Sequence, residues 1–195
     1  MKHASTSMES MEQGIAATAE RLFADVGFQK TTVSDIASKM CMSPANVYRF
    51  FSSKAEINNE VGRRLLSEIE VAVDHIIENS SSASEKLRAT IATVEKMNAR
   101  RFLSNQRLHE LLETAFVENW PIVKDHIQKL DESLAEIISY GNDEKEFDVE
   151  DYELAAILVR SACLRFYDPR VIIDCADEPE PTVDQMVDFC LGALR

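Results

Sequence analysis

Apolar residues recur with a helical period through most of the chain, and this pattern predicts an all-α protein. One face of a first helix is formed by residues spaced i, i+4, i+7, i+8 and i+11, namely Ile15, Ala19, Leu22, Phe23 and Val26. Gly27 stands where a left-handed C-cap would end this helix, and Phe28 is placed to fold back onto its last turn. The first helix is therefore predicted to end at Val26.

Two short helices and one long helix are predicted to follow. Thr32 and Asp35 have the spacing of a capping box, which starts a short helix with an apolar stripe. A second short helix is predicted from Ser43, with Pro44 at its first position, where the missing N–H costs nothing. Another capping box, Ser-Lys-Ala-Glu at 53–56, opens a long helix at about 54–78.

The rest of the chain is also predicted to be helical, beyond a polar break at 79–84. Five helices are expected at about 83–101, 104–117, 120–140, 150–167 and 182–194. Pro121 is predicted near the start of one, Gly141 at its end, and Asp168 with Pro169 at the end of the next. The acidic segment 141–151 is predicted to be a solvated loop.

Composition and charge separate the N-terminal quarter from the remainder. The 195 residues are 45% hydrophobic with a formal charge of −13, enough to bury one large core or two small ones. Residues 1–54 hold six Lys or Arg against five Asp or Glu, whereas the remainder holds 15 basic and 29 acidic residues. Only the N-terminal quarter is therefore suited to an anionic partner.

Several classes of protein are disfavoured by what the sequence lacks. It has no apolar run long enough to span a membrane and no signal-peptide core, so a cytoplasmic location is expected. None of its four histidines has a glutamate three residues earlier, and phosphate-loop and nucleophile-elbow motifs are absent. We therefore expect no enzymatic activity, no cofactor and no metal site. Four free thiols are predicted at Cys41, Cys163, Cys175 and Cys190.

The two predicted short helices are joined by about four residues, and the second has bulky polar residues on one side. This arrangement is typical of a helix-turn-helix. Val47 and Phe51 are predicted to anchor the second helix inward. Its other residues would then enter a DNA major groove, where asparagine pairs with adenine edges. The predicted DNA contacts are Thr32, Ser34, Ser43, Pro44, Ala45, Asn46, Tyr48, Arg49 and Lys54.

The stretch "IAATAERLFADVGFQKTTVSDIASKMCMSPANVYRFFSSKAEI", residues 15–57, resembles the DNA-binding domain of the TetR family of bacterial transcriptional regulators. The resemblance implies a DNA-binding domain at 1–54 and a ligand-binding and dimerisation domain at 55–195. It also implies a homodimer on a palindromic operator, acting as a repressor that a small-molecule inducer releases. Three residues depart from the family pattern: Cys41 replaces a common turn glycine, Ser34 a common arginine, and Phe50 a common histidine or tyrosine.

Candidate residues in the C-terminal part fall into two groups. A ligand pocket is predicted to include some of Met97, Phe102, His109, Phe116, Trp120, His126 and Phe166, although ordinary core packing also explains them. Two apolar stripes are predicted to form the dimer interface, with intramolecular core as the alternative: Leu154, Ile157 and Leu158, and Val183, Met186, Val187, Cys190, Leu191 and Leu194.

Two further features allow more than one interpretation. The triplet Met40-Cys41-Met42 is interpreted as core packing between helices rather than as a metal or redox site. A thiol switch at Cys163, Cys175 and Cys190 stays open as a minor alternative. The competing function is a helical ligand-binding or adaptor protein that does not bind DNA, which would not need the polar outward face of residues 43–49.

Overall fold

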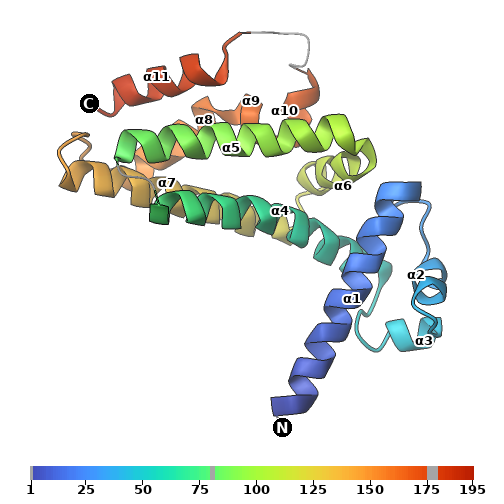
Figure 1. Cartoon of the computed structure of the whole chain (residues 1–195). Helices are drawn as coiled ribbons and strands as arrows, with labels where there is room; N and C mark the ends of the chain where they lie inside the picture. The colour runs from blue at the N-terminus through green and yellow to red at the C-terminus, as the bar shows by residue number, and fades with distance from the viewer. Residues whose placement is uncertain (1, 80–81, 175–179) are drawn as a thin grey trace.

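The computed structural model describes residues 2–79, 82–174 and 180–195, and all regular elements among them are α-helices (Figure 1). An all-α fold with an N-terminal helix-turn-helix and a C-terminal helical part is thus confirmed. In chain order the helices are α1 (Lys2–Val26), α2 (Val33–Lys39), α3 (Pro44–Val47), α4 (Lys54–Asn79), α5 (Ala83–Ser104), α6 (Gln106–Val117), α7 (Pro121–Asp143), α8 (Tyr152–Ala162), α9 (Leu164–Tyr167), α10 (Pro169–Asp174) and α11 (Val183–Ala193).

The predicted helix ends in the N-terminal part are confirmed by backbone geometry, a ring contact and local hydrogen bonds. Gly27 has a φ of 95°, and Phe28 packs edge-on against Phe23 with ring centroids 6.4 Å apart. The Thr32 N–H donates to the Asp35 carboxylate at 2.8 Å, and the Asp35 N–H donates back to the Thr32 hydroxyl at 3.2 Å. Such reciprocal caps satisfy backbone donors that a short helix would otherwise leave unpaired.

Two hydrophobic cores hold the helices together. The N-terminal core joins α1, α2 and α3 to the first half of α4, to α6 and to the start of α7. Its buried members are Ile15, Ala19, Phe23, Phe28, Val33, Ile36, Ala37, Val47, Phe51, Ile57, Val61, Leu65, Leu66, Leu108, Leu111, Leu112, Ala115, Phe116, Ile122 and Val123. Since this core draws on residues on both sides of position 54, the predicted domain boundary there stays a prediction.

The C-terminal core lies between the second half of α4 and helices α5, α7, α8, α9 and α11. Its buried members include Ile69 and Val73 of α4, Leu87 and Ile91 of α5, and Leu134 of α7. α5 runs along α4 on one side and contacts α9 and α11 on the other (Figure 1). The long helix α4 thus contributes one half to each core.

The predicted solvated loop after α7 is wrong in part, although most of residues 144–151 are exposed and non-helical. α7 continues past Gly141 to Asp143, and the chain then folds back so that the N–H of Phe147 donates to the Gly141 carbonyl at 3.1 Å. Phe147 is buried in the C-terminal core. The Glu146 carboxylate accepts from the N–H groups of Ala83 and Ser84 at 2.8 and 3.0 Å, so this acidic segment caps the start of α5.

The single helix predicted at 150–167 is also wrong in part. The chain breaks at Cys163 into α8 and α9, and α10 follows where no helix was predicted. Asp168 allows α10 to start, because its carboxylate accepts from the Arg170 N–H at 2.9 Å. Across the described parts of the chain, each helix is either too short or too polar to cross a lipid bilayer.

We predict that Gly141→Ala destabilises the protein by about 1–3 kcal/mol, the usual range for overpacking a core. A Cβ at Gly141 would lie 2.1 Å from Phe147 Cδ2 and 2.9 Å from the Ala83 Cβ, and Phe147 is buried and cannot swing aside. Gly192→Ala is the matched control, since a Cβ there meets nothing within 4 Å. It should be neutral or stabilising by up to ~1 kcal/mol. Urea unfolding followed by circular dichroism measures both, and equal stability of the two variants would contradict the prediction.

Candidate nucleic-acid interface

The helix-turn-helix is built by a turn between α2 and α3 that depends on an unusual backbone conformation. Cys41 has a φ of 54°, in the left-handed region that favours glycine. This conformation lets the Met42 N–H donate to the Ala37 carbonyl at 2.9 Å, which closes the end of α2. The Ser43 hydroxyl then accepts from the Asn46 N–H at 3.3 Å and starts α3. A cysteine in place of the common turn glycine is therefore accommodated, at the cost of some backbone strain.

α3 buries one side and exposes the other, as expected of a recognition helix. Val47 is fully buried and Phe51 almost so, and both belong to the N-terminal core. Beyond Val47 the chain continues in tight turns, with the N–H groups of Phe50 and Phe51 donating to the Val47 carbonyl. Five of the predicted contacts on this segment are exposed: Ser43, Pro44, Ala45, Tyr48 and Arg49.

Asn46 is only half-buried and is held by its neighbour. The Arg49 guanidinium lies 3.5 Å from the Asn46 Oδ1, so the two side chains lie together one helical turn apart. An arginine that contacts the amide oxygen leaves the amide NH₂ group available as a donor. The pair thus presents a cation and an amide donor side by side.

The remaining predicted contacts flank α3. Thr32 and Ser34 are exposed at the start of α2, although the Thr32 hydroxyl also donates to Asp35 at 2.7 Å. Lys54, the first residue of α4, donates from its Nζ to the Gln29 carbonyl at 3.1 Å. That bond uses one of the three ammonium protons and fixes the charge at the helix N-terminus, where an anion is favoured. α2 and α3 lie beside α1, away from the C-terminal helices (Figure 1).

The Met40-Cys41-Met42 triplet divides between core and surface. Met40 and Met42 are partly buried and pack against the N-terminal core, as predicted. Cys41 is exposed, so its predicted role as core packing is wrong. The reason is its left-handed φ, which turns the side chain away from the faces that α2 and α3 bury.

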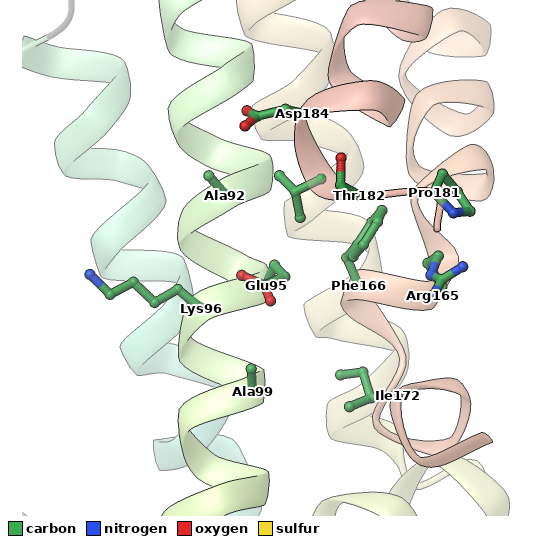
Figure 2. Close-up of a pocket in the computed structure, with 11 residues that line it drawn as sticks. Ala92, Glu95, Lys96, Ala99, Arg165, Phe166, Ile172, Pro181, Thr182 and Asp184 are labelled. Carbon is green, nitrogen blue, oxygen red and sulfur yellow. The ribbon is translucent and has the colours of Figure 1, made fainter. Parts of the chain in front are cut away.

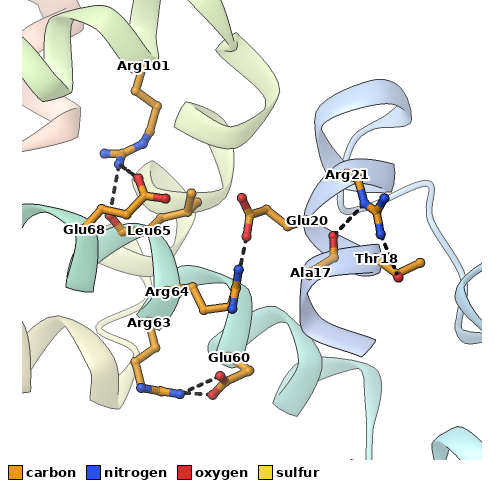
Figure 3. Close-up of polar contacts among 10 residues, drawn as sticks. All are labelled: Ala17, Thr18, Glu20, Arg21, Glu60, Arg63, Arg64, Leu65, Glu68 and Arg101. Carbon is orange, nitrogen blue, oxygen red and sulfur yellow. Dashed lines mark hydrogen bonds and ion pairs between the residues drawn. The ribbon is translucent and has the colours of Figure 1, made fainter. Parts of the chain in front are cut away.

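Polar contacts join the N-terminal helices to the rest of the molecule (Figure 3). Arg64 of α4 donates to the Glu20 carboxylate of α1 at 3.1 Å. Arg101 of α5 is partly buried and donates to the Leu65 carbonyl of α4 at 3.0 Å, and burial lowers the pKa of this guanidinium. Arg107 of α6 donates to the Ala24 carbonyl, in the last turn of α1, at 3.4 Å.

The structure does not bring the predicted ligand-pocket residues together. Met97 and Phe102 are half-buried in the bundle, and Phe102 packs edge-on against His109. The buried His109 Nε2 donates to the Pro169 carbonyl at 2.9 Å, and burial lowers the pKa of this imidazole.

The other predicted pocket residues also have internal contacts. The buried His126 Nδ1 lies 2.8 Å from the Glu70 carboxylate. Phe116 lies in the N-terminal core, and the Trp120 indole N–H donates to Glu118 at 2.8 Å. A ligand role for the six residues other than Phe166 therefore stays a prediction.

A cleft of about 590 Å³ lies between α5 and residues of α9, of α10 and of the start of α11 (Figure 2). Phe166 is the predicted pocket residue that lines it. Ala92 and Ala99 form a small-residue wall on α5, opposite Ile172 and Val183, and Glu95 stands between the two alanines. The cleft is within the size range of sites for small organic ligands, roughly 300–1,000 Å³.

The two apolar stripes predicted to form the dimer interface differ in their exposure to solvent. Leu154, Ile157 and Leu158 of α8 are exposed, with 52%, 43% and 60% of their surface accessible. On α11, Val187, Cys190, Leu191 and Leu194 are buried within the chain, and Val183 and Met186 pack against the C-terminal core. The structure therefore supports the alternative for the α11 stripe, which is intramolecular core. The reason is that α11 packs over α5 and α8.

The sequence interpretation missed Phe189, the exposed aromatic residue of α11. It is 68% accessible and lines a surface groove with Leu154 and Leu158 of α8. The available signal was its position beside Cys190 in the α11 stripe, since a residue one place along a helix lies about 100° round from its buried neighbour.

Comparisons with known proteins agree with this geometry. The family description "Bacterial regulatory proteins, tetR family" matches residues 15–61, and "Tetracyclin repressor-like, C-terminal domain" matches residues 83–187. The "Uncharacterized HTH-type transcriptional regulator YhgD" of Bacillus subtilis (strain 168) is 27% identical over 130 residues. That match covers 65% of this chain and 62% of the relative, so the chain spans less than two thirds of the relative's length.

Solved structures show the same fold at low identity. A TetR/AcrR-family regulator from Thermobifida fusca has a TM-score of 0.68 at 19% identity, covering 95% of this chain and 99% of that one. The regulator FadR from Bacillus subtilis, in complex with stearoyl-CoA, has a TM-score of 0.63 at 16% identity, covering 93% and 96%. Since one family description spans more than half of the chain and the other spans the helix-turn-helix, the chain belongs to the TetR family of bacterial regulatory proteins.

Proposed function

We propose that this protein is a cytoplasmic transcriptional repressor that binds a palindromic DNA operator as a homodimer and leaves it when a small organic molecule binds. TetR-family regulators are DNA-binding proteins and not enzymes, which matches the expectation from the sequence. The observation that carries the proposal is the two-sided character of α3. Its inner side is fixed in the N-terminal core, while its outer side presents Pro44, Ala45, Tyr48 and Arg49 to solvent.

The proposed base contacts follow from the chemistry of this outer side. Pro44 and Ala45 offer apolar surface to thymine methyl groups, and the Asn46 amide offers a donor to base edges. Tyr48 and Arg49 are placed to contact phosphates or bases, and Lys54 to contact a phosphate beside the α4 N-terminus. The acidic remainder of the chain repels DNA, which restricts binding to the N-terminal helices.

Dimerisation is proposed through the apolar surface formed by Leu154, Ile157 and Leu158 of α8 with Phe189 of α11. These four side chains are 43–68% accessible, and Leu154, Leu158 and Phe189 line one groove. An exposed apolar face of this kind is typical of an interface between copies of one chain. Two recognition helices held about 34–36 Å apart would then match successive major grooves of a palindrome.

The cleft lined by Phe166 is the proposed inducer site. Its lining combines apolar residues with the charged Glu95, Lys96, Arg165 and Asp184, and this mixture favours a small molecule with an apolar body and a polar end. The FadR structure with stearoyl-CoA supports the idea that this fold accepts a ligand with both an apolar and a charged part. The cleft adjoins α10, and α10 holds His109 of α6 through the Pro169 carbonyl.

A ligand there is proposed to shift the populations of two arrangements of the helices. α6 in turn holds the end of α1 through Arg107, and Arg64 ties α1 to α4. Movement of α6 relative to α1 would change the separation of the two recognition helices in the dimer. Such a shift requires only that the ligand prefers the arrangement that does not fit the operator.

Selection of random duplex DNA by the purified protein tests the proposed function directly. A two-fold symmetric winner, whose affinity falls steeply with salt, would support a dimeric DNA reader. The absence of any enriched sequence, with weak binding even at low salt, would favour the adaptor alternative. If the selection yields an operator, a thermal-shift screen of small molecules, repeated with that DNA bound, would identify candidate inducers.

We predict that Tyr48→Ala and Lys54→Ala weaken operator binding without unfolding the protein. Tyr48→Ala should lose ~1–3 kcal/mol of binding free energy, and Lys54→Ala should lower the salt slope by about 1. Fluorescence anisotropy at several salt concentrations measures both effects. Lys124→Ala, an exposed lysine of α7, is the control and should bind like the unchanged protein. Unaltered affinity in both test variants would remove α3 and the start of α4 from the DNA interface.

We predict that Leu158→Glu converts the dimer into monomers, because it places a charge in the proposed apolar interface. Leu103→Glu is a matched control, since Leu103 on α5 is 81% accessible and far along the chain from α8. Sedimentation velocity measures the oligomeric state, and circular dichroism confirms that both variants are folded. Operator affinity should fall at least tenfold in the monomeric variant, about 1.4 kcal/mol, because each half-site is then bound alone. A dimeric Leu158→Glu protein would place the interface elsewhere.

A further inference from the structure

The charged side chains around the cleft between α5 and the start of α11 differ in what they already bind. Asp184 of α11 accepts from the Arg88 guanidinium at 3.2 Å, so a neighbour balances its charge. Arg165 of α9 donates to the Glu180 carbonyl at 2.7 Å. Lys96 of α5 is exposed, and Figure 2 shows it extending away from the other labelled side chains. Three of the four charged residues in the lining are thus paired, bonded or directed elsewhere.

Glu95 is the fourth charged residue, and its carboxylate is unpaired. It stands on α5 between Ala92 and Ala99 and is half-buried in the wall of the cleft (Figure 2). Over residues 2–79, 82–174 and 180–195, nothing donates a hydrogen bond to this carboxylate or forms an ion pair with it. Taking a carboxylate partly out of water without a partner is unfavourable. A positively charged group in the cleft would supply the missing partner.

The wall that faces α5 is largely apolar and includes an aromatic ring. It is formed by Ile172 of α10, Val183 of α11 and Phe166 of α9. Phe166 belongs to the C-terminal core, which holds its ring in place, and the Arg165 Cζ lies 5.6 Å from the ring centroid. The ring therefore already takes part in one contact with a cation. Cys175, one of the predicted free thiols, follows α10 and lies outside the described residues.

The charge of the surrounding chain acts in the same direction as Glu95. Residues 55–195 hold 29 acidic and 15 basic residues, so the C-terminal part is strongly negative. A surface of one sign raises the local concentration of oppositely charged small molecules and lowers that of molecules with the same charge. Cations are therefore drawn to this part of the molecule, and anions are repelled from it.

We propose that this cleft binds organic cations, with the positive group at the Glu95 carboxylate and an apolar body between α5 and Phe166. The ligand class is an amine that is protonated at neutral pH and carries an alkyl or aryl group. Its ammonium group donates to Glu95, and a hydrogen bond between two charged groups is stronger than one between neutral groups. This proposal rests on the proposed function, in which the cleft is the inducer site, and it adds the sign of the inducer's charge.

An anionic ligand is the competing class, because Arg165 and Lys96 also line the cleft. To bind an anion at the apolar wall, Arg165 would have to give up its bond to the Glu180 carbonyl, and Lys96 would have to turn back toward the cleft. The anion would also leave Glu95 unpaired and would meet its negative charge. A cation requires none of these changes, which is why the contacts favour it.

Three compounds with one apolar body test the sign of the charge without reference to DNA. At pH 7, 4-phenylbutylamine is positive, 4-phenylbutanol is neutral and 4-phenylbutyrate is negative. Isothermal titration calorimetry with the purified protein measures each affinity. We expect the amine to bind at least tenfold more tightly than the alcohol, and the acid to bind most weakly. Equal affinities, tightest binding of the acid, or no binding of any compound at millimolar concentration would overturn the proposal.

A charge-removing variant tests whether Glu95 is the group that recognises the cation. Glu95→Gln keeps the shape of the side chain, so its affinity for the amine should fall about tenfold, to that of the alcohol, while its affinity for the alcohol should not change. Glu110→Gln is the matched control, because Glu110 is exposed on α6 and is not among the residues lining the cleft. An amine that still binds Glu95→Gln tenfold more tightly than the alcohol would place the cation elsewhere and overturn the proposal.

A cleft-filling variant tests the position of the apolar body. Ala99→Leu adds bulk to the α5 wall and keeps a good helix former there, so circular dichroism should show a folded protein. It should weaken the binding of the amine and of the alcohol by a similar factor, at least fivefold, because both bodies use the same space. Unchanged affinity for both compounds in this variant would remove the cleft as the binding site.

Operator affinity with and without the amine tests the regulatory consequence separately. We expect saturating 4-phenylbutylamine to weaken operator binding at least fivefold, and Glu95→Gln to need about ten times more amine for the same effect. An amine that binds at Glu95 but leaves operator affinity unchanged would disprove the inducer role and leave the cation site in place. Failure of the ligand-free protein to select any operator would instead count against the proposed function.

Discussion

The sharing of α4 between two hydrophobic cores is the constraint on which the rest of the structure depends. Its first half buries Ile57 and Val61 with the helix-turn-helix, and its second half buries Ile69 and Val73 among the C-terminal helices. Gly62 allows a close approach between α4 and Ile122 of α7, because a Cβ there would lie 2.6 Å from the Ile122 Cδ1. A rotation or tilt of α4 therefore cannot alter one core without altering the other.

Charged contacts also hold α4 against the helices beside it. Glu70 of α4 lies against His126 and Lys129 of α7, and burial opposes ionisation there while the hydrogen bonds from α7 lower the pKa of Glu70 overall. Arg101 reaches the backbone of α4 from α5. Exposed ion pairs stabilise a protein little, but partly buried ones resist separation, so these contacts hold α4 against α5 and α7.

Features that depend on neighbouring residues were predictable from the sequence. The Thr32–Asp35 box, the Ser43 cap and the left-handed Gly27 each involve groups within a few positions, and the structure has all three. The direction of a side chain at a tight turn was less predictable, which is why Cys41 proved exposed. The end of α7 was also misjudged, since only the burial of Phe147 shows that the following acidic segment folds back.

By itself the sequence determined the helical class, the helix-turn-helix with its outward residues, and the family, because local periodicity and capping encode them directly. Tertiary structure alone decided which apolar stripe is surface and which is core. The stripes on α8 and α11 have the same period, yet α11 is covered by α5 and α8 whereas Leu158 and its neighbours face solvent. Contacts between distant helices depend on packing that no local pattern records.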